Sequence, residues 1–478
     1  MKTTLQDAAQ LVSRPHSSAV PSSTSPSNEA VLGKLRDLDP KWLRIYWHDY
    51  TSTPRCRLIP IRQVYKALES GGTVSPSVTQ AALGLLQTDV MIPQIGPSGG
   101  YLLEPDWSSL RPGPAKDHVS CHGEFRETDG SEVTLCPRTL LRRTVQRART
   151  LHALEFLVGF EIEFLLVERN PDPACAAAEK YRPLRGSDGH AWSAARAVAD
   201  WEAQGSVGVF IDEAAERLDA AGVEVEMFHP ESAPGQFELV LAALPPLEAC
   251  DALLHARQVL ESSAAHHGLR VTLHPKPFAT VCGSASHAHL SVRSTAPGGG
   301  DGPEVYEPFY AGILNHLPAL LAFTYASPAS YERMADGCWA GGRWITWGTL
   351  NKETPLRKCD GAHWEFKVLD GLANPYLVIA AVLGAGIQGV KSGEPLKWGD
   401  CTADPARLTE AQRYELGIYE MLPAGLREAL AGLAKDEELW EDLKPELVQR
   451  YIDTKNAELE FLERMEPEER RQWIMERY

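Results

Sequence analysis

The sequence predicts an α+β fold with a small N-terminal domain and a larger second domain. Three observations lead to this prediction: a length of 478 residues with 44% hydrophobic content, strand-like segments interleaved with helical ones, and a long helical segment that begins near residue 136. A chain of this length usually has more residues than a single hydrophobic core accommodates, and it divides into domains. We therefore expect the small domain at residues 31–135 and the larger domain at residues 136–478.

Residues 1–30 are expected to be disordered. Ser and Pro are abundant in residues 13–30, and such a composition offers too little apolar surface to stabilise a fold. The segment has an early Lys but lacks the apolar stretch of a secretory signal.

The small domain should begin with a β-hairpin. The segment "WLRIYWHDYTSTPRCRLIPI" (residues 42–61) predicts two strands joined by a Thr-Pro turn, and "IRQVYKALESG" (residues 61–71) predicts a helix that ends at Gly71. Strand-like segments continue as far as "SEVTLCPR" at residues 131–138.

The larger domain should open with a helix at residues 136–152 and alternate strands with helices after it. A second helix is predicted at residues 246–268, and the Gly-rich residues 294–304 predict a flexible loop. From Thr409 onwards the pattern is helical. Strands that carry acidic residues are predicted at residues 155–168, 222–231 and 235–244.

Charge and cysteine usage narrow the class of partner. The net charge of −17 argues against a nucleic acid or an anionic membrane surface, which require a basic face. Nine cysteines without a C-x-x-C motif favour reduced thiols in a cytoplasmic protein. The sequence contains no run of 18 apolar residues, so no membrane-spanning helix is predicted. Because nucleic acid and membrane surfaces are both disfavoured, we expect small-molecule partners.

Acidic residues on the predicted strands form the first candidate site. Glu161 and Glu163 in "GFEIEF" are two residues apart, so both project from one face, while Phe160, Ile162 and Phe164 lie on the other. Taken alone, this pattern is more typical of a strand with one solvated face than of a catalytic site.

Three more segments change that interpretation. Glu231 and Glu238 flank the Pro-Gly turn of "HPESAPGQFE", His287 and His289 share a face in "GSASHAHLSV", and Glu365 lies on the predicted strand of "AHWEFKVLDG". Carboxylates that converged in this number would repel one another unless a cation lay between them. Oxygen-rich ligation favours Mg²⁺ or Mn²⁺, and two such ions suit phosphoryl transfer.

Basic residues in loop-like segments are candidate partners for the phosphates and carboxylate of a substrate. Any one of them could equally be a solvated surface charge. They are Lys276 in "HPKPF", Arg333 in "SYERM", and Lys352 and Arg357 in "NKETPLRK".

These motifs, in this order, resemble the type I glutamine synthetase family, and within it the fungal glutamine-synthetase-like proteins of the FluG C-terminal type. The resemblance runs from about Leu35 to Tyr478. It implies a β-grasp-like small domain, followed by a catalytic domain with a curved antiparallel sheet flanked by helices. It also implies a homo-oligomeric ring, possibly a dodecamer.

The resemblance further implies ATP as co-substrate and two or more Mg²⁺ (or Mn²⁺) ions per site. One ion would be held by Glu163, Glu231 and Glu238, and a second by Glu161, His287 and Glu365. The residues implied for ATP are Lys276, His289, Ser291, Lys352 and Arg357. Those implied for the acid substrate and its reaction are Gly283, Cys282, Arg333, Trp339 and Lys367, together with Arg357.

The chain departs from the family pattern where the nucleophile binds. The Asp that deprotonates ammonium aligns with Val74, and the flap Glu aligns with Trp339. Elsewhere Cys282 replaces an Asn, while Lys367, His363 and Lys352 replace Arg residues. Because all six implied metal ligands are present, the pattern favours an ATP-dependent ligase that joins glutamate, or a related acid, to an organic amine. A glutamine synthetase that uses ammonium and a non-catalytic regulatory or scaffold protein are the alternatives.

Overall fold

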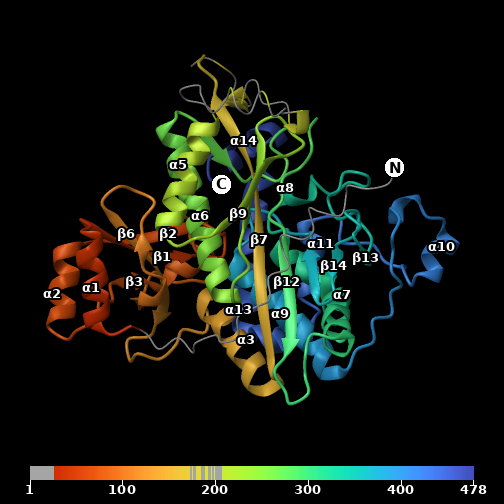
Figure 1. The fold of residues 1–478 in the computed structure, drawn as a ribbon, viewed down its shortest axis with the longest axis horizontal. Coiled ribbons are helices and arrows are strands. Elements are labelled where there is room, and N and C mark those ends of the chain that lie inside the picture. Colours follow the sequence, from red (N-terminus) through yellow and green to blue (C-terminus); the bar gives the residue numbers. More distant parts are fainter. Residues whose placement is uncertain are drawn as a thin grey trace.

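The computed structural model describes residues 26–172, 175, 179–184, 189–191, 195, 199 and 207–478. Its strands form two sheets, one within residues 42–126 and one within residues 154–366 (Figure 1). The first sheet and its helices, which correspond to the predicted small domain, are red and orange and lie beside the part built on the second sheet, whose long strand β7 runs through its middle. The predicted α+β class is confirmed.

The first sheet has six strands in the order β2-β1-β6-β4-β3, with β5 paired to β6. All pairs are antiparallel except β1 with β6, which is parallel. Helices α1 (Asn28–Leu38) and α2 (Ile61–Glu69) accompany it. The strands are β1 (Trp42–His48), β2 (Pro54–Pro60), β3 (Ser77–Thr79), β4 (Gly100–Pro105), β5 (Arg111–Pro112) and β6 (His118–Arg126).

Asp49 explains why the chain reverses between β1 and β2. Its Oδ1 accepts hydrogen bonds from the backbone N–H groups of Thr51 and Thr53, at 2.9 and 3.0 Å. Its Oδ2 accepts one from Arg55 Nε at 2.6 Å. Such side-chain bonds to nearby backbone groups stabilise turns. The predicted hairpin and the helix after it are confirmed.

Two predictions for the first 138 residues need correction. Helix α1 begins at Asn28, capped by Ser27, so the predicted disordered segment extends too far; residues 1–25 lie outside the described residues. The segment "SEVTLCPR" forms no regular strand. It contributes only an isolated bridge between Glu132 and Arg126, because the chain turns here before entering α3 (Pro137–His152).

The second sheet has nine strands in the order β13-β14-β15-β12-β7-β10-β9, with β8 and β11 also paired to β7. Its pairs are antiparallel except β13 with β14. The strands are β7 (Leu154–Arg169), β8 (Tyr181–Pro183), β9 (Val225–Pro230), β10 (Gln236–Leu241), β11 (Arg270–Thr272), β12 (Ala288–Ser294), β13 (Trp347–Thr349), β14 (Leu356–Asp360) and β15 (His363–Phe366).

Helices pack around this sheet and include the predicted α3 and α6 (Pro246–His266). The others are α5 (Val207–Ala220), α7 (Pro303–Thr324), α8 (Pro328–Tyr331), α9 (Pro375–Ser392), α10 (Glu410–Glu415), α11 (Leu426–Leu433), α12 (Glu437–Leu443), α13 (Pro445–Leu462) and α14 (Pro467–Met475). The last five confirm the helical pattern predicted after Thr409.

Helices α7 and α9 pack unusually closely. A Cβ atom added to Gly312 would lie 2.3 Å from the carbonyl oxygen of Ala385, and one on Gly389 would lie 2.0 Å from that of Pro308. Only glycine allows this approach. Helix α9 is long and apolar enough to cross a membrane by length and composition, but 78% of it is buried inside the protein, as in the core of a globular domain.

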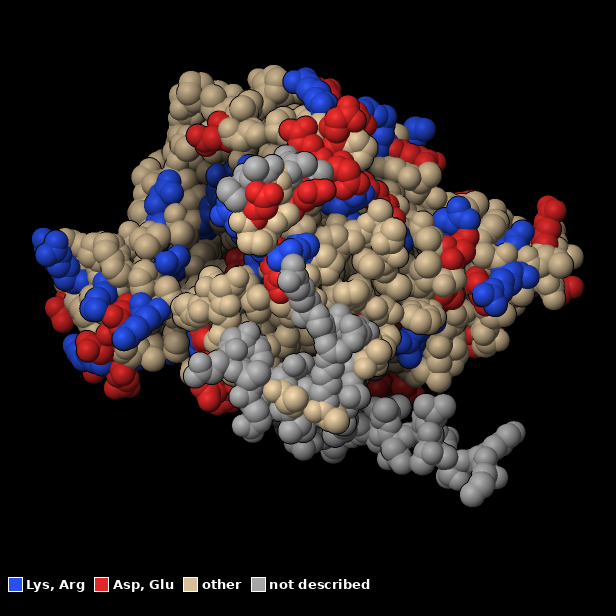
Figure 2. Space-filling model, turned by 90° about the horizontal axis from the view of Figure 1, so that it is seen from above, with Lys and Arg blue, Asp and Glu red and all other residues tan. Residues whose placement is uncertain are grey.

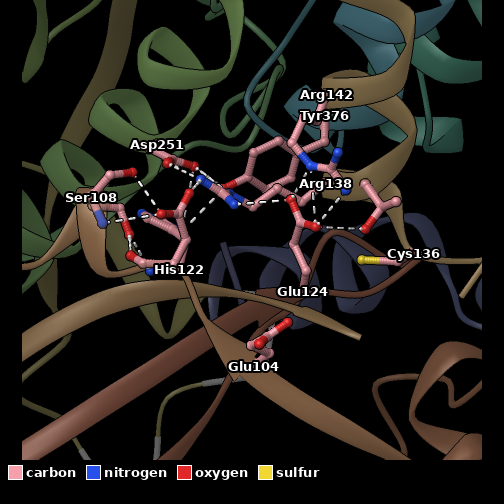
Figure 3. Close-up of polar contacts among 12 residues, drawn as sticks. Glu104, Ser108, His122, Glu124, Cys136, Arg138, Arg142, Asp251 and Tyr376 are labelled. Carbon is pink, nitrogen blue, oxygen red and sulfur yellow. Dashed lines mark hydrogen bonds and ion pairs between the residues drawn. The ribbon is translucent and has the colours of Figure 1, made fainter. Parts of the chain in front are cut away.

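A buried ion-pair network joins the two domains (Figure 3). Arg138, at the start of α3, donates to Asp251 of α6 through Nε and Nη2, at 3.1 and 2.7 Å. The same guanidinium contacts Glu124 of β6 at 3.2 Å and Asp106 at 2.6 Å. Tyr376 of α9 completes the contact by donating to Asp251 at 2.5 Å. Charged groups from the two predicted domains are therefore paired in the interior, beside the apolar core that both share.

Candidate active site

Strand β7 carries Glu161 and Glu163 at the centre of the second sheet. Phe160, Ile162 and Phe164 alternate with them and are fully buried, as the sequence pattern predicted. On one side β10 places Glu238 directly opposite Glu163. On the other side the residue before β12, His287, accepts a backbone hydrogen bond from Glu161 N at 3.1 Å. The sheet thus brings residues distant in sequence to one face.

Glu161 is held by two histidines. Its Oε2 lies 3.0 Å from His287 Nδ1, and its Oε1 lies 3.0 Å from His289 Nε2. Although burial opposes the effect, these hydrogen bonds hold the pKa of Glu161 well below its usual range. The carboxylate is therefore ionised at neutral pH.

Glu163 is the more deeply buried of the two β7 carboxylates. It accepts hydrogen bonds from Gln236 Nε2 at 2.8 Å and from the backbone of Ala285 at 3.1 Å. His287 Nδ1 lies 3.7 Å away. Burial raises the pKa of Glu163, which indicates that its negative charge is incompletely compensated by the protein alone.

The Pro-Gly turn brings a second pair of acids, Glu231 and Glu238, to the site. Gly235 adopts a φ of +75°, and Glu231 N donates to Gln236 O at 2.8 Å, so the chain reverses between β9 and β10. This reversal sets Glu238 opposite His229, with 3.1 Å between Glu238 Oε1 and His229 Nε2. Burial raises the pKa of Glu238 to about 8. The hydrogen bond from His229 opposes this rise, and the neighbouring carboxylates add to it.

Glu365 is paired with two cations. Arg357 Nη1 lies 2.9 Å from its Oε2, and Lys367 Nζ lies 2.9 Å from its Oε1. Although burial opposes the effect, the charge of Lys367 lowers the pKa of Glu365 to about 2. His287 Nδ1 lies 3.3 Å from Glu365 Oε1, so this carboxylate belongs to the same cluster as Glu161.

The donor set fits divalent cations. Five carboxylates and imidazole nitrogens lie close together, and the raised pKa values of Glu163 and Glu238 mark negative charge that a cation would compensate. Three overlapping groups have ligand atoms within 4.8 Å of one another. They are Glu161, Glu238 and His287; Glu161, His289 and Glu365; and His229, Glu231 and Glu238. Five of the six implied ligands occur in these groups, which divide them differently from the two predicted sets. The sixth, Glu163, lies beside them, 3.7 Å from His287 Nδ1.

Arg333 lies buried behind Glu163. Its Nη1 donates to the hydroxyl of Tyr325 at 2.5 Å, and its Nε has no partner within the described ranges. A Cβ on Gly283 would come within 2.8 Å of Arg333 Cβ, so glycine is required at 283 for this approach. A buried guanidinium with spare donors is suited to a carboxylate.

The remaining predicted residues are distributed more widely. Lys276 donates to the carbonyl of Val281 at 2.5 Å, inside its own loop, next to the half-buried Cys282. Ser291 lies on β12 two residues after His289, so the two share a face. Lys352 is exposed.

The two residues predicted to line the nucleophile site differ in exposure. Trp339 is 53% exposed, on a loop held by Glu353, which accepts from the backbone of Gly337 and Trp339 at 3.1 and 2.8 Å. Val74 is only 7% exposed and belongs to the hydrophobic core.

Sequence reasoning missed His229, Gln236 and Cys359. His229 could have been found, because it lies two residues before Glu231, and alternation along the strand predicted at residues 222–231 would place both on one face. Gln236 and Cys359 carried no such signal; their roles depend on neighbours from other strands.

A curled sheet is flanked by helices, and acids and histidines converge on one of its faces. Comparison with known proteins identifies the class of ligase domain that has this arrangement. The family described as "Glutamine synthetase, catalytic domain" matches residues 134–478. The chain belongs to the glutamine synthetase family.

Two curated relatives and one solved structure illustrate the similarity. Protein fluG of Emericella nidulans is 38% identical over 92% of this chain, which spans only 49% of fluG. Gamma-glutamylpolyamine synthetase GlnA3 of Streptomyces coelicolor is 32% identical, over 90% of this chain and 92% of that protein. A crystal structure titled as a novel glutamine synthase homolog covers 92% of this chain and 99% of its own, with a TM-score of 0.74 and 27% identity.

Proposed function

We propose that this protein is an ATP- and Mg²⁺-dependent ligase that joins the side-chain carboxylate of glutamate, or a related acid, to an organic amine through an acyl phosphate. The observation that carries this proposal is the convergence of five carboxylates with Arg333, Arg357 and Lys367 at one face of the second sheet. A divalent ion bound there would neutralise charge on the transferred phosphoryl group.

The residues of the chain divide into two roles. Glu161, Glu163, Glu231, Glu238, His287 and Glu365 would hold the ions, while Arg357 would contact the phosphates. Arg333, whose guanidinium is oriented by Tyr325, would bind the α-carboxylate of the acid substrate. Binding of both substrates beside the ions would place the carboxylate for attack on the γ-phosphate.

Two observations favour an organic amine over ammonium. A relative that shares 32% identity is named as a gamma-glutamylpolyamine synthetase. In addition, the large ring of Trp339 is exposed on its loop where the family pattern has an acid. An aromatic ring favours the hydrocarbon body of an amine and its cationic end, whereas ammonium offers only charge.

ADP release with glutamate and a panel of amines tests the proposal. The full chain would be incubated with Mg²⁺, ATP and glutamate, and ADP release measured with ammonium, methylamine, ethanolamine, putrescine and spermidine in turn. We expect at least one organic amine to support release above the amine-free rate. Release supported by ammonium alone would indicate a glutamine synthetase, and binding of ATP without release under any condition would indicate a non-catalytic protein.

A further inference from the structure

A second cluster of metal-binding side chains lies beside the carboxylate site. It consists of His289, Cys359 and His363, whose ligand atoms lie within 4.8 Å of one another. The three side chains come from three neighbouring strands, β12, β14 and β15, and all are half-buried. An ion from solution could therefore reach them.

A β-bulge aims Cys359 at the two histidines. The β14–β15 register shifts between Lys358 and Asp360, so Cys359 is the extra residue without a direct partner on β15. His363 lies opposite Ser291 on β12, two residues from His289. The local irregularity thus brings a thiol to a pair of imidazoles that the regular register already places together.

The two imidazoles already share a hydrogen bond. His289 Nδ1 lies 2.7 Å from His363 Nε2, with the ring centroids 5.0 Å apart. Two Zn–N bonds of about 2.0–2.1 Å at a tetrahedral angle place their nitrogens roughly 3.3 Å apart. A separation of the rings by about half an ångström would let an ion replace the shared proton.

The other nitrogen of His289 has the partner that a zinc-binding histidine usually has. Its Nε2 lies 3.0 Å from Glu161 Oε1. When Nε2–H donates to this carboxylate, the Nδ1 lone pair faces His363 and Cys359. A carboxylate that orients a histidine in this way strengthens its binding to metal.

We infer that His289, His363 and Cys359 form a site for a soft divalent ion, Zn²⁺ in the first instance, which shares only His289 with the carboxylate groups that fit Mg²⁺. Thiolate and imidazole ligands select zinc over magnesium, and a three-residue set leaves a fourth position for water. Binding converts the thiol to a zinc thiolate and releases one proton from sulfur to solvent, while the proton that His363 Nε2 shares with His289 Nδ1 moves to His363 Nδ1. The ion would immobilise His289, one of the residues implied for ATP, so that Zn²⁺ would inhibit the ligase.

Cobalt absorption tests the site without turnover. The full chain, saturated with Mg²⁺ to fill the oxygen-rich sites, would be titrated with Co²⁺ and the thiolate-to-cobalt charge-transfer band recorded. We expect a band that saturates at one equivalent and disappears on addition of Zn²⁺. Cys359→Ser should abolish it and weaken Zn²⁺ binding, measured by calorimetry, by roughly 100-fold.

Two further variants make the result decisive. Cys338→Ser, at an exposed cysteine outside the cluster, should leave the band and the Zn²⁺ affinity unchanged. Cys359→Ala repeats the test with a different side-chain volume, and circular dichroism checks the fold of each variant. Where Mg²⁺-dependent ADP release is measurable, Zn²⁺ should inhibit it in the wild type at least 10-fold more strongly than in Cys359→Ser. The inference is overturned if wild-type protein gives no charge-transfer band, or if Cys359→Ser binds Zn²⁺ as tightly as the wild type.

Discussion

His229 Nε2 lies 3.1 Å from Glu238 Oε1, directly across the β9–β10 pair. The turn between these strands thus delivers a histidine together with two acids. His229 also lies 4.0 Å from Glu231, so one imidazole neighbours both carboxylates that flank the turn. The hydrogen bond to Glu238 raises the pKa of His229 to about 9. The protonated imidazole therefore compensates part of the negative charge of these carboxylates, which a bound cation would otherwise neutralise.

Glu238→Gln should separate stability from activity. The substitution keeps a hydrogen-bond acceptor for His229 but removes one of three carboxylates that repel one another, so we expect the metal-free protein to have an equal or higher Tm. Mg²⁺-dependent ADP release should fall by roughly 100-fold or more, because an ion loses a ligand. Thermal unfolding with and without Mg²⁺, beside turnover, measures both effects.

The matched control is Glu226→Gln, on the neighbouring strand β9 and exposed. It should change neither Tm nor turnover appreciably. A Glu238→Gln protein that turned over ATP at the wild-type rate would exclude Glu238 from the metal site.

Arg333→Lys should weaken glutamate binding far more than ATP binding. Lysine keeps the charge but loses the fork of donors that Tyr325 orients, and a bidentate contact is worth about 1.5–3 kcal/mol. We expect glutamate affinity to fall roughly 10- to 100-fold in calorimetric titrations. Tyr325→Phe, which removes only the orienting hydroxyl, should cause a smaller loss. Equal losses for ATP and glutamate would assign Arg333 a structural role instead.

Arg138→Met should destabilise the protein by about 3–5 kcal/mol. It would leave the Asp251 carboxylate buried without its guanidinium partner, although Glu124 keeps Arg142 at 2.9 Å, and an unpaired buried charge is costly. Denaturant unfolding should show the loss, and the two domains should unfold in separate steps because the network joins them. Lys41→Met breaks an exposed pair with Asp117 and should leave the free energy of unfolding almost unchanged. A similar small loss for Arg138→Met would show that the domains are held by apolar contacts alone.

His122, which lies beside this network, should make stability depend on pH. Burial lowers the pKa of His122 to about 4, from an ordinary value of 6.5, so the folded protein keeps it neutral where the unfolded chain binds a proton. The contribution of His122 to the free energy of unfolding is therefore complete above pH 6.5 and is lost as the pH falls to 4. The loss is on the order of 3 kcal/mol, since each pH unit in this window contributes about 1.4 kcal/mol.

The free energy of unfolding of His122→Gln, measured between pH 4 and 7, should decline less steeply than that of the wild type. His266→Gln, at an exposed histidine, provides the control. Parallel pH profiles for His122→Gln and wild type would contradict the assignment.

Sequence periodicity predicted much of the site but not its details. Alternation on one strand was enough to place Glu161 and Glu163 on the same face, and the buried Phe160, Ile162 and Phe164 confirm the underlying pattern. The same rule applied to Glu231 would have found His229.

Contacts between distant segments could not be predicted in this way. Arg138 and Asp251 are 113 residues apart, and nothing local in either helix marks the pair. Cys359 faces His289 because of a bulge, which sequence alternation does not reveal. Val74 was placed at the nucleophile site by alignment, and its burial in the hydrophobic core could not be predicted from that alignment. Alignment gives an equivalent position, whereas exposure depends on local packing.

The identity of the product formed in a mixture tests the central claim most directly. The full chain would be given Mg²⁺, ATP, glutamate and equal concentrations of ammonium and the organic amine that best supports ADP release, and the products would be separated by mass spectrometry. We predict that the glutamyl amide of the organic amine exceeds glutamine by roughly 10-fold or more, and that Trp339→Glu shifts the ratio towards glutamine. Glutamine as the main product of the wild-type protein would contradict the account.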